Sequence, residues 1–175
     1  MNITDLLAPT EIMLDVRAAN KRALLEEFAG RAAGSLRLPA ERVASYLLKR
    51  EGLGSTGIGR GVAIPHARLP DLQRPRGLLA KLKPPIDFDA IDGQAVDLVF
   101  ALLLPATAEQ EALAALALVA RTLRSPETLA RLRAGDCLAA AGRNFPSLRR
   151  LFLGQSGGHP WHDIPRKLPP TLSAR

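Results

Sequence analysis

Residues 51–66 read Glu51-Gly-Leu-Gly-Ser-Thr-Gly-Ile-Gly-Arg-Gly-Val-Ala-Ile-Pro-His66, a glycine-rich half followed by an apolar half that ends in histidine. Glycine takes positive φ and lets the backbone approach a ligand, and successive backbone N–H groups in such a segment can bind an anion. Residues 62–64 predict a short buried strand, and Pro65 favours an extended residue before it. We therefore expect His66 to leave the end of a strand in a fixed direction, beside a loop suited to phosphate.

This arrangement predicts phosphoryl chemistry at His66, because a neutral imidazole has a free nitrogen lone pair near neutral pH. Arg50 would hold the phosphoryl oxygens, and Ser55, Thr56 and Gly57 would supply hydroxyl and backbone donors. Simpler interpretations remain open. The histidine could merely end a strand, the arginine could favour a helix C-terminus, and the two hydroxyl residues could form a turn.

Two other phosphate-binding motifs are excluded. No Gly-Lys-Ser/Thr follows the glycines, as a Walker loop requires. The glycines precede a strand instead of opening a helix, unlike a Rossmann fingerprint.

The rest of the chain alternates between helical and strand patterns, which predicts an α/β fold: a mixed β-sheet with helices on both faces. The apolar run 96–104 suits a central strand that is covered on both sides. A helix cap is predicted at Thr4. Helices or strands are predicted to end at Pro9, Gly34 and Pro84-Pro85. The predicted helices span 3–7, 20–34, 39–50, 108–123, 127–133 and 138–141, and the predicted strands 12–16, 62–64, 77–83 and 96–104. The buried stripe of the helix 108–123 is predicted to be Leu113, Leu116, Ala120 and Leu123.

The composition changes near Gly154. We expect one domain over residues 1–153 and a Pro/Gly-rich tail over 154–175. The tail contains His159-Pro-Trp-His162. Two histidines without cysteines or well-placed carboxylates do not make a metal site, so Trp161 is better interpreted as an anchor that docks on a surface. No metal or cofactor is expected.

Composition limits the function classes. The chain has 175 residues, is 47% hydrophobic and carries a net charge of +7, with 24 basic and 17 acidic residues. The basic residues are scattered without interleaved aromatics, so we expect no nucleic-acid partner. A lone cysteine, Cys137, excludes an internal disulfide and suits a reducing compartment, where it would be a small apolar residue. The start of the chain does not read as a signal peptide and no run is long enough to span a membrane, so we expect a cytoplasmic protein without membrane insertion.

The stretch from Arg50 to His66 strongly resembles the active-site signature of type 2 EIIA domains, which belong to the bacterial phosphoenolpyruvate-dependent phosphotransferase system. Residues 88–105 resemble the central strand of that family with its lead-in, and residues 116–123 the helix that follows. The likeness covers about residues 3–135 and is nearest to the nitrogen-regulatory branch, which is not fused to a sugar permease. It implies the mannitol-type EIIA fold, with Arg50 beside His66 and with phosphate accepted from a histidine phosphocarrier protein.

The resemblance also has a departure. The family usually carries a second histidine at the start of the helix after the central strand, where this chain has Ala112. Its loss weakens the orientation of the imidazole of His66, and phosphorylation is still expected.

Three functions stay open. The first is a phosphoryl-accepting regulator whose partners are sensor kinases or potassium transporters. The second is a sugar-specific component that passes phosphate to an EIIB partner of a fructose- or mannitol-type permease. The third is a binding module that signals by contact alone. The oligomeric state is also open, a homodimer included.

Overall fold

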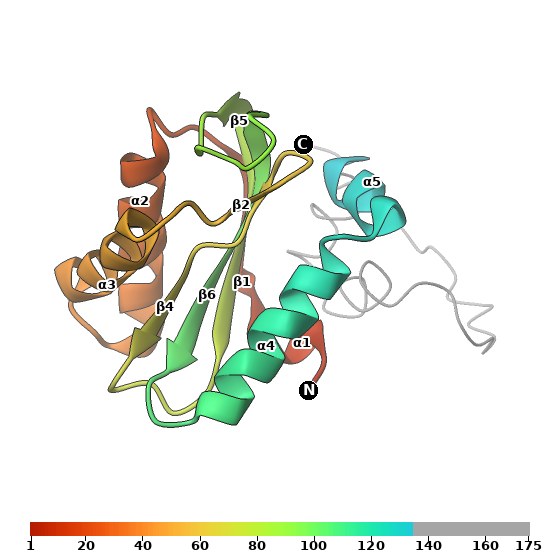
Figure 1. The fold of residues 1–175 in the computed structure, drawn as a ribbon. Coiled ribbons are helices and arrows are strands. Elements are labelled where there is room, and N and C mark those ends of the chain that lie inside the picture. The colour runs from red at the N-terminus through yellow and green to blue at the C-terminus, as the bar shows by residue number, and fades with distance from the viewer. Residues whose placement is uncertain (135–175) are drawn as a thin grey trace, which may run out of the picture.

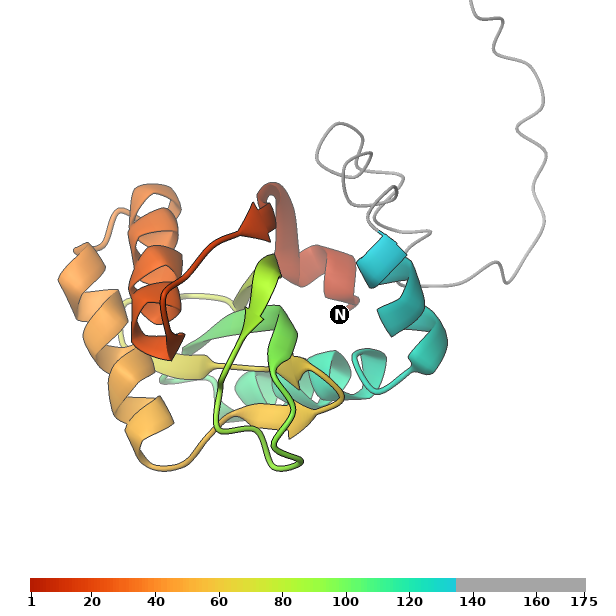
Figure 2. The ribbon, with the colours of Figure 1, turned by 90° about the horizontal axis from the view of Figure 1, so that it is seen from above.

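A computed structural model describes residues 1–134 as a mixed, six-stranded sheet between two helical layers (Figure 1). Helices α2 and α3 cover one face, and α1, α4 and α5 lie on the other (Figures 1 and 2). The predicted fold class is thereby confirmed. The helices are α1 Ile3–Leu6, α2 Lys21–Leu36, α3 Ala40–Gly52, α4 Glu109–Thr122 and α5 Pro126–Ala134, and the strands are β1 Leu7–Val16, β2 Gly57–Gly59, β3 Val62–Ala63, β4 His66–Leu69, β5 Arg76–Ile86 and β6 Val96–Pro105.

Strand β6 lies at the centre of the fold, as its apolar sequence predicts. Alternate residues of a strand face opposite sides of a sheet. Val99, Ala101 and Leu103 pack in the core beneath α2 and α3. Leu98, Phe100, Leu102 and Leu104 pack in the second core, beneath α1, α4 and α5. Every one of these residues is buried, so β6 contributes side chains to the hydrophobic cores on both faces of the sheet.

The sheet order is β1-β5-β6-β3-β2, and β4 also pairs with β6. Strand β5 runs antiparallel to β6, whereas β3 and β4 run parallel to it. The pairs Ala63–Val99 and His66–Leu102 place β3 and β4 one after the other along the same side of β6. This register fixes the position of His66 against the central strand.

Several predicted boundaries are wrong. Strand β1 begins at Leu7 and runs through Pro9, and β5 continues through Pro84-Pro85 to Ile86. Proline is tolerated at sheet edges and irregular positions, and the pairing of β5 with both β1 and β6 shows register shifts. Asn2 is the N-cap of α1, not Thr4, and its backbone N–H donates to Asp5 Oδ2.

Helix ends and faces also differ in part from the predictions. Asn20 caps α2 as predicted, with its side chain accepting from the N–H of Ala23 at 2.9 Å. The helix passes Gly34 and ends where Arg37 takes a left-handed conformation. In α4 the prediction missed the phase of the helix. Its small residues face the sheet, and Leu113 is 55% exposed, whereas Leu123 is buried as predicted. The buried residues of α4 are Ala112, Ala115 and Val119.

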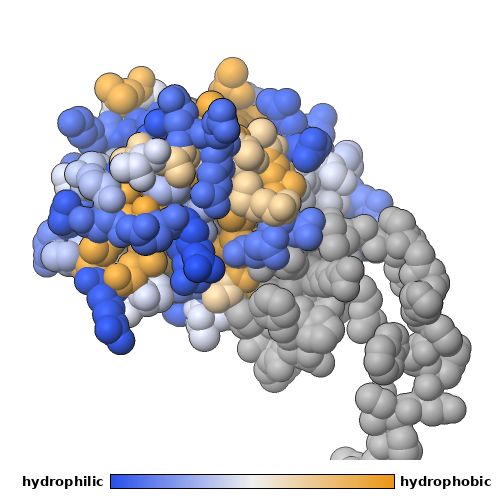
Figure 3. Space-filling model, turned by 90° about the horizontal axis from the view of Figure 1, so that it is seen from below, coloured by the Kyte–Doolittle hydropathy of each residue, from blue (hydrophilic) through white to orange (hydrophobic). Residues whose placement is uncertain are grey.

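The predictions for Cys137, for the helical piece 138–141 and for the tail with its histidines and tryptophan concern residues outside the described range 1–134. On the face drawn in Figure 3, hydrophilic side chains are interspersed with apolar ones. Among residues 1–134, no helix is both long and apolar enough to cross a membrane.

Candidate functional site

The glycine-rich segment folds into a loop and a tight hairpin that lead from α3 to His66. Gly54, Gly59 and Gly61 all have positive φ, which explains why side chains are absent there. Strands β2 and β3 pair antiparallel, and the N–H of Ile64 donates to the carbonyl of Thr56 at 3.0 Å. The sequence did not predict β2, because glycines rarely signal a strand.

His66 begins strand β4, which the sequence also did not predict. The carbonyl of Pro65 accepts from the N–H of Leu102 at 2.8 Å, and His66 then pairs with Leu102 itself. The proline therefore separates two short strands that share one neighbour. His66 does leave the end of an apolar strand, but it is held by β6 and does not project from a free loop.

Two hydrogen bonds orient the imidazole of His66. Its Nδ1 lies 3.0 Å from the carbonyl oxygen of Ile64, and its Nε2 lies 3.0 Å from Nε of Arg50. A carbonyl can only accept and a guanidinium can only donate. The neutral ring therefore carries its proton on Nδ1, and Nε2 presents its lone pair. This tautomer is assigned from the partners of the two nitrogens.

The environment also keeps the ring of His66 neutral. Its pKa is lowered from 6.5, first because the half-buried ring is shielded from water, and further because Arg50 and Arg68 are nearby cations. The carbonyl of Ile64 and the carboxylate of Glu51 act in the opposite direction and do not overcome burial. At neutral pH the lone pair of Nε2 is therefore not lost to protonation.

Arg50 connects the glycine loop to the imidazole. It lies in the last turn of α3, where the helix dipole favours a cation. Its Nη1 donates to the carbonyl of Gly54 at 3.0 Å, while its Nε donates to His66. The structure thus brings together the two residues that the sequence singled out first.

The other predicted phosphate-binding residues are placed differently. The hydroxyl of Ser55 donates to the carbonyl of Phe88 at 2.6 Å and accepts from the N–H of Gly57 at 3.0 Å. Thr56 directs both its N–H and its hydroxyl at the carboxylate of Glu51. In this structure these donors hold the loop together, so phosphate binding by Ser55, Thr56 and Gly57 stays a prediction.

Sequence reasoning missed two charged residues beside the site. Glu51 is only 7% exposed, and Lys21 of α2 forms an ion pair with it at 3.1 Å. The sequence does show that Glu51 lies between Arg50 and the glycines. Its partner lies 30 residues away, and no local pattern joins the two.

Ala112 occupies a closed position. It is 1% exposed and belongs to the apolar core that also contains Ile64 and Leu102. His66 is the single histidine among residues 1–134, so no second imidazole assists it in that part of the chain. The described residues also contain no cluster of three or more His, Cys, Asp or Glu side chains that could hold a metal ion.

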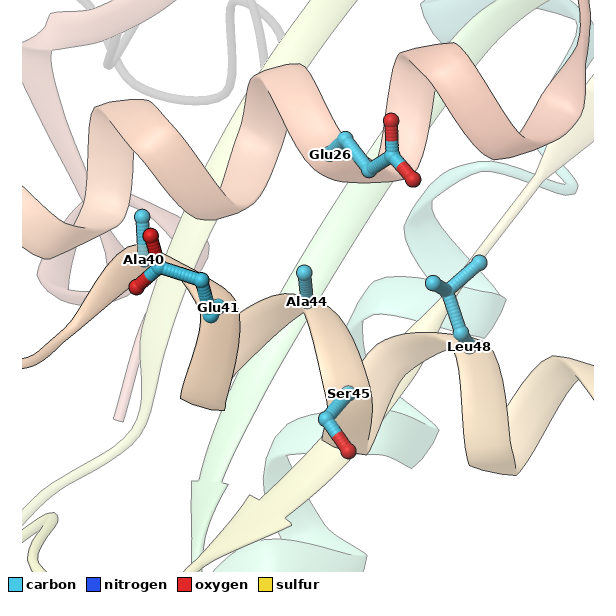
Figure 4. A pocket seen from close by; sticks show the side chains of 6 residues that line it. All are labelled: Glu26, Ala40, Glu41, Ala44, Ser45 and Leu48. Carbon is cyan, nitrogen blue, oxygen red and sulfur yellow. The ribbon is translucent and has the colours of Figure 1, made fainter.

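Two open hollows in the described surface are lined by neither Arg50 nor His66. One, of about 520 Å³, runs between α2 and α3 (Figure 4). Its lining is Glu26, Ala40, Glu41, Ala44, Ser45 and Leu48. The other, of about 470 Å³, is lined by Ser55, Gly57, Ile58, Asp89, Ile91 and Arg124. Neither contains a nucleophile activated by a base, so the Arg50–His66 pair is the better candidate site.

Comparison with known proteins gives one consistent family. The family model described as phosphoenolpyruvate-dependent sugar phosphotransferase system, EIIA 2, matches residues 5–137. A nitrogen regulatory protein of Bradyrhizobium diazoefficiens is 47% identical over 134 residues, which cover 77% of this chain and 88% of the relative. The crystal structure of nitrogen regulatory protein IIA-Ntr from Neisseria meningitidis matches with a TM-score of 0.72 and 30% identity, over 86% of this chain and 98% of the other. The IIA mannitol protein of Escherichia coli, at 18% identity and a TM-score of 0.62 over 83% of this chain and 97% of the other, shares the fold.

Proposed function

Because the chain belongs to the EIIA 2 family of the phosphoenolpyruvate-dependent sugar phosphotransferase system, we propose that it carries a phosphoryl group on Nε2 of His66. The donor is a histidine phosphocarrier protein, and the main role is to regulate partner proteins according to phosphorylation state. The relatives named as nitrogen regulatory proteins support the regulatory role. Partners of that kind, such as sensor kinases or potassium transporters, are part of the proposal.

The observation that carries the proposal is the pair of hydrogen bonds on the ring of His66. The carbonyl of Ile64 keeps the proton on Nδ1, so the lone pair on Nε2 faces Arg50. A nucleophile needs that lone pair, and the phosphoryl group needs a nearby cation. The guanidinium of Arg50 can stabilise both the free and the phosphorylated ring, because its N–H groups can turn from Nε2 to the phosphoryl oxygens as the phosphoryl group arrives.

The transfer step balances without a metal. Nε2 attacks the phosphorus of the donor phosphohistidine in line, and a new N–P bond forms while the N–P bond of the donor breaks. The electron pair of the broken bond returns to the donor nitrogen, and a donor ring protonated on its other nitrogen leaves as neutral imidazole. The proton of His66 stays on Nδ1, which continues to donate to the carbonyl of Ile64. Both bonds are of one type, so positioning and charge stabilisation supply most of the catalysis.

Leu53 offers a contact for the carrier. It lies three residues beyond Arg50 and is 82% exposed. An exposed apolar side chain next to a reactive pair suits a protein partner that must bring its own histidine close.

The test is incubation with the phosphorylated carrier, followed by detection of acid-labile label and ³¹P NMR of the product. We expect wild type to take up phosphate on Nε2, and His66→Ala to take up none. Label on the alanine variant would assign the chemistry to another residue. If wild type takes up no label, signalling by contact alone is the function that remains of the three.

A further inference from the structure

Around one buried carboxylate the structure contains a charge network that contacts the glycine loop and, in the described part of the chain, makes no hydrogen bond to His66. Its centre is the carboxylate of Glu51, the residue after Arg50. Burying a carboxylate is unfavourable unless the charge is paired and hydrogen-bonded, and removing one partner of a buried pair leaves an uncompensated charge. A buried charge so close to a reactive pair therefore calls for a specific role.

Glu51 is fully engaged by donors from two other segments. It accepts from Nζ of Lys21 at 3.1 Å, from the N–H of Thr56 at 3.1 Å, and from the hydroxyl of Thr56 at 2.6 Å. A carboxylate that receives three such bonds has little freedom to rotate. It joins the end of α3 to the start of α2 and to the middle of the glycine loop.

Lys21 extends the network to the segment that precedes β6. Its Nζ donates to Asp89 Oδ2 at 2.7 Å and to the carbonyl of Phe88 at 3.4 Å, and it lies 5.3 Å from the centre of the Phe88 ring. Burial alone would lower the pKa of Lys21, but the hydrogen bonds to Asp89 and Glu51 raise it above 10.5. The cation is thus fixed, and Phe88 also accepts from Ser55, which holds the loop from the other side.

Gly54 lies between these fixed points. The loop is anchored before it, where its N–H donates to the backbone carbonyl of Glu51 at 3.2 Å, and after it at Ser55 and Thr56. The carbonyl of Gly54 then accepts from Nη1 of Arg50 at 3.0 Å. The same guanidinium donates through its Nε to Nε2 of His66 at 3.0 Å.

The pairing of charges adds a second effect. Glu51 and Arg50 are neighbours of opposite sign, and a direct pair would draw the guanidinium away from His66. The ion pair of Glu51 is instead with Lys21. The negative charge is therefore neutralised by a different cation, and Arg50 stays on the imidazole.

We propose that Glu51, held by Lys21 and Thr56, is a positioning residue that locks the glycine loop so that the carbonyl of Gly54 directs Arg50 at Nε2 of His66. This inference rests on the proposed phosphotransfer at His66. Glu51 acts on His66 mainly through Arg50, beside a smaller effect of its charge, which raises the pKa of the ring, so its loss should lower kcat and leave the affinity for the carrier nearly unchanged.

The experiment measures labelling by phosphorylated carrier for wild type, Glu51→Gln and Thr56→Val. For Glu51→Gln we expect kcat to fall about 10- to 100-fold, as for a displacement of about 1 Å in a positioned group, with KM for the carrier within about twofold. Thr56→Val removes one hydrogen bond, and its kcat should fall about three- to tenfold. The double variant should lose no more than Glu51→Gln alone, because both changes release the same loop.

The matched control is Glu26→Gln, which removes the same charge from an exposed i,i+4 pair with Arg22 on α2. Its kcat should stay within about twofold of wild type. Thermal unfolding of each variant checks that it is folded at the assay temperature. If Glu51→Gln does not fold, Thr56→Val carries the test.

A second readout is independent of phosphotransfer. The ¹⁵N chemical shifts of His66 report its tautomer, and wild type should show the proton on Nδ1. In Glu51→Gln and Thr56→Val the population with the proton on Nε2 should rise, because Arg50 no longer holds that nitrogen. Wild-type kcat and tautomer in both folded variants would overturn the inference. An unlabelled wild type would overturn the proposed function, and the tautomer measurement would still decide the role of Glu51.

Discussion

Replacing Arg50 with methionine tests the centre of the proposed site, because this side chain donates hydrogen bonds both to the glycine loop and to the imidazole. The variant loses the hydrogen bond from Nε to His66 and the one from Nη1 to Gly54, both 3.0 Å long. It keeps a flexible chain of similar length, so the packing at the end of α3 should change little. What disappears is the positive charge and the two donors.

The magnitude follows from the distance. A guanidinium within hydrogen-bond reach of Nε2 lies about 4 Å from the charge of a phosphoryl group on that atom, and unit charges at that separation interact by about 4 kcal/mol at an effective dielectric constant of about 20. Removing one preorganised donor from a charged transition state typically costs about 10²- to 10³-fold in rate. The two figures agree, and we expect labelling of Arg50→Met to be about 10²- to 10³-fold slower.

The pKa of His66 gives an independent check on the same variant. Burial is the main cause that lowers it, and the charge of Arg50 is a smaller one. In Arg50→Met the pKa should therefore rise, because one of the causes that lower it is removed. The ring remains neutral at pH 7.5 in both proteins, so a slower reaction there cannot come from protonation of the nucleophile.

The assay is rapid-quench labelling by phosphorylated carrier at pH 7.5, together with an NMR titration of His66. Arg50→Lys serves as the comparison, because it keeps the charge and loses the planar fork, and it should fall between wild type and the methionine variant. A rate for Arg50→Met within threefold of wild type would refute the reasoning. So would a pKa of His66 that falls.

Three further outcomes are expected. Gly77→Ala places a Cβ 2.5 Å from Cε1 of the buried Phe100 and should destabilise the fold by about 1–3 kcal/mol, whereas Gly30→Ala, in open space on α2, should stabilise it by about 0.5–1 kcal/mol; urea unfolding compares them. As the pH falls, labelling should reach half its maximum at a pH below 6.5, because burial lowers the pKa of His66. Because the pKa of His66 is lower in the folded state than in the unfolded state, the neutral ring contributes to the free energy of unfolding above pH 6.5. That contribution is lost as the pH falls through the pKa of the folded state. Ala112→His should destabilise the fold by about 1–3 kcal/mol through overpacking and so lower the thermal midpoint, and an unchanged midpoint would show that the core has room for the ring.

The fold could be predicted where a pattern reports burial directly. The apolar run of β6 indicated a strand covered on both faces, and Asn20 marked the start of α2. The phase of α4 was missed because leucines were expected inside, whereas close packing on the sheet selects Ala112 and Ala115. Strand β4 was missed because its pairing depends on β6, about 35 residues later, and periodicity within four residues says nothing of it.

The candidate site, like the fold, could be predicted from the sequence only in part. His66 and Arg50 stand in one local stretch whose chemistry can be recognised, and the structure brings them within 3.0 Å. Ser55 and Thr56 were singled out because hydroxyls suit phosphate, but residue type does not reveal which acceptor a hydroxyl faces. The partners are Phe88 and Glu51, and the first of these is far along the chain. A single sequence does not show which residues far apart in the chain form hydrogen bonds with each other.

The way the ring of His66 is held bears on the missing second histidine. An imidazole needs one fixed donor or acceptor at each nitrogen to select a tautomer and an orientation. Here Nδ1 is held by the carbonyl of Ile64, a backbone atom that no side-chain substitution removes, and Nε2 by Arg50. Both positions are filled without help from α4, where Ala112 packs in the apolar core. An additional imidazole would therefore act on the phosphoryl group more than on the ring, and its absence should slow transfer without abolishing it.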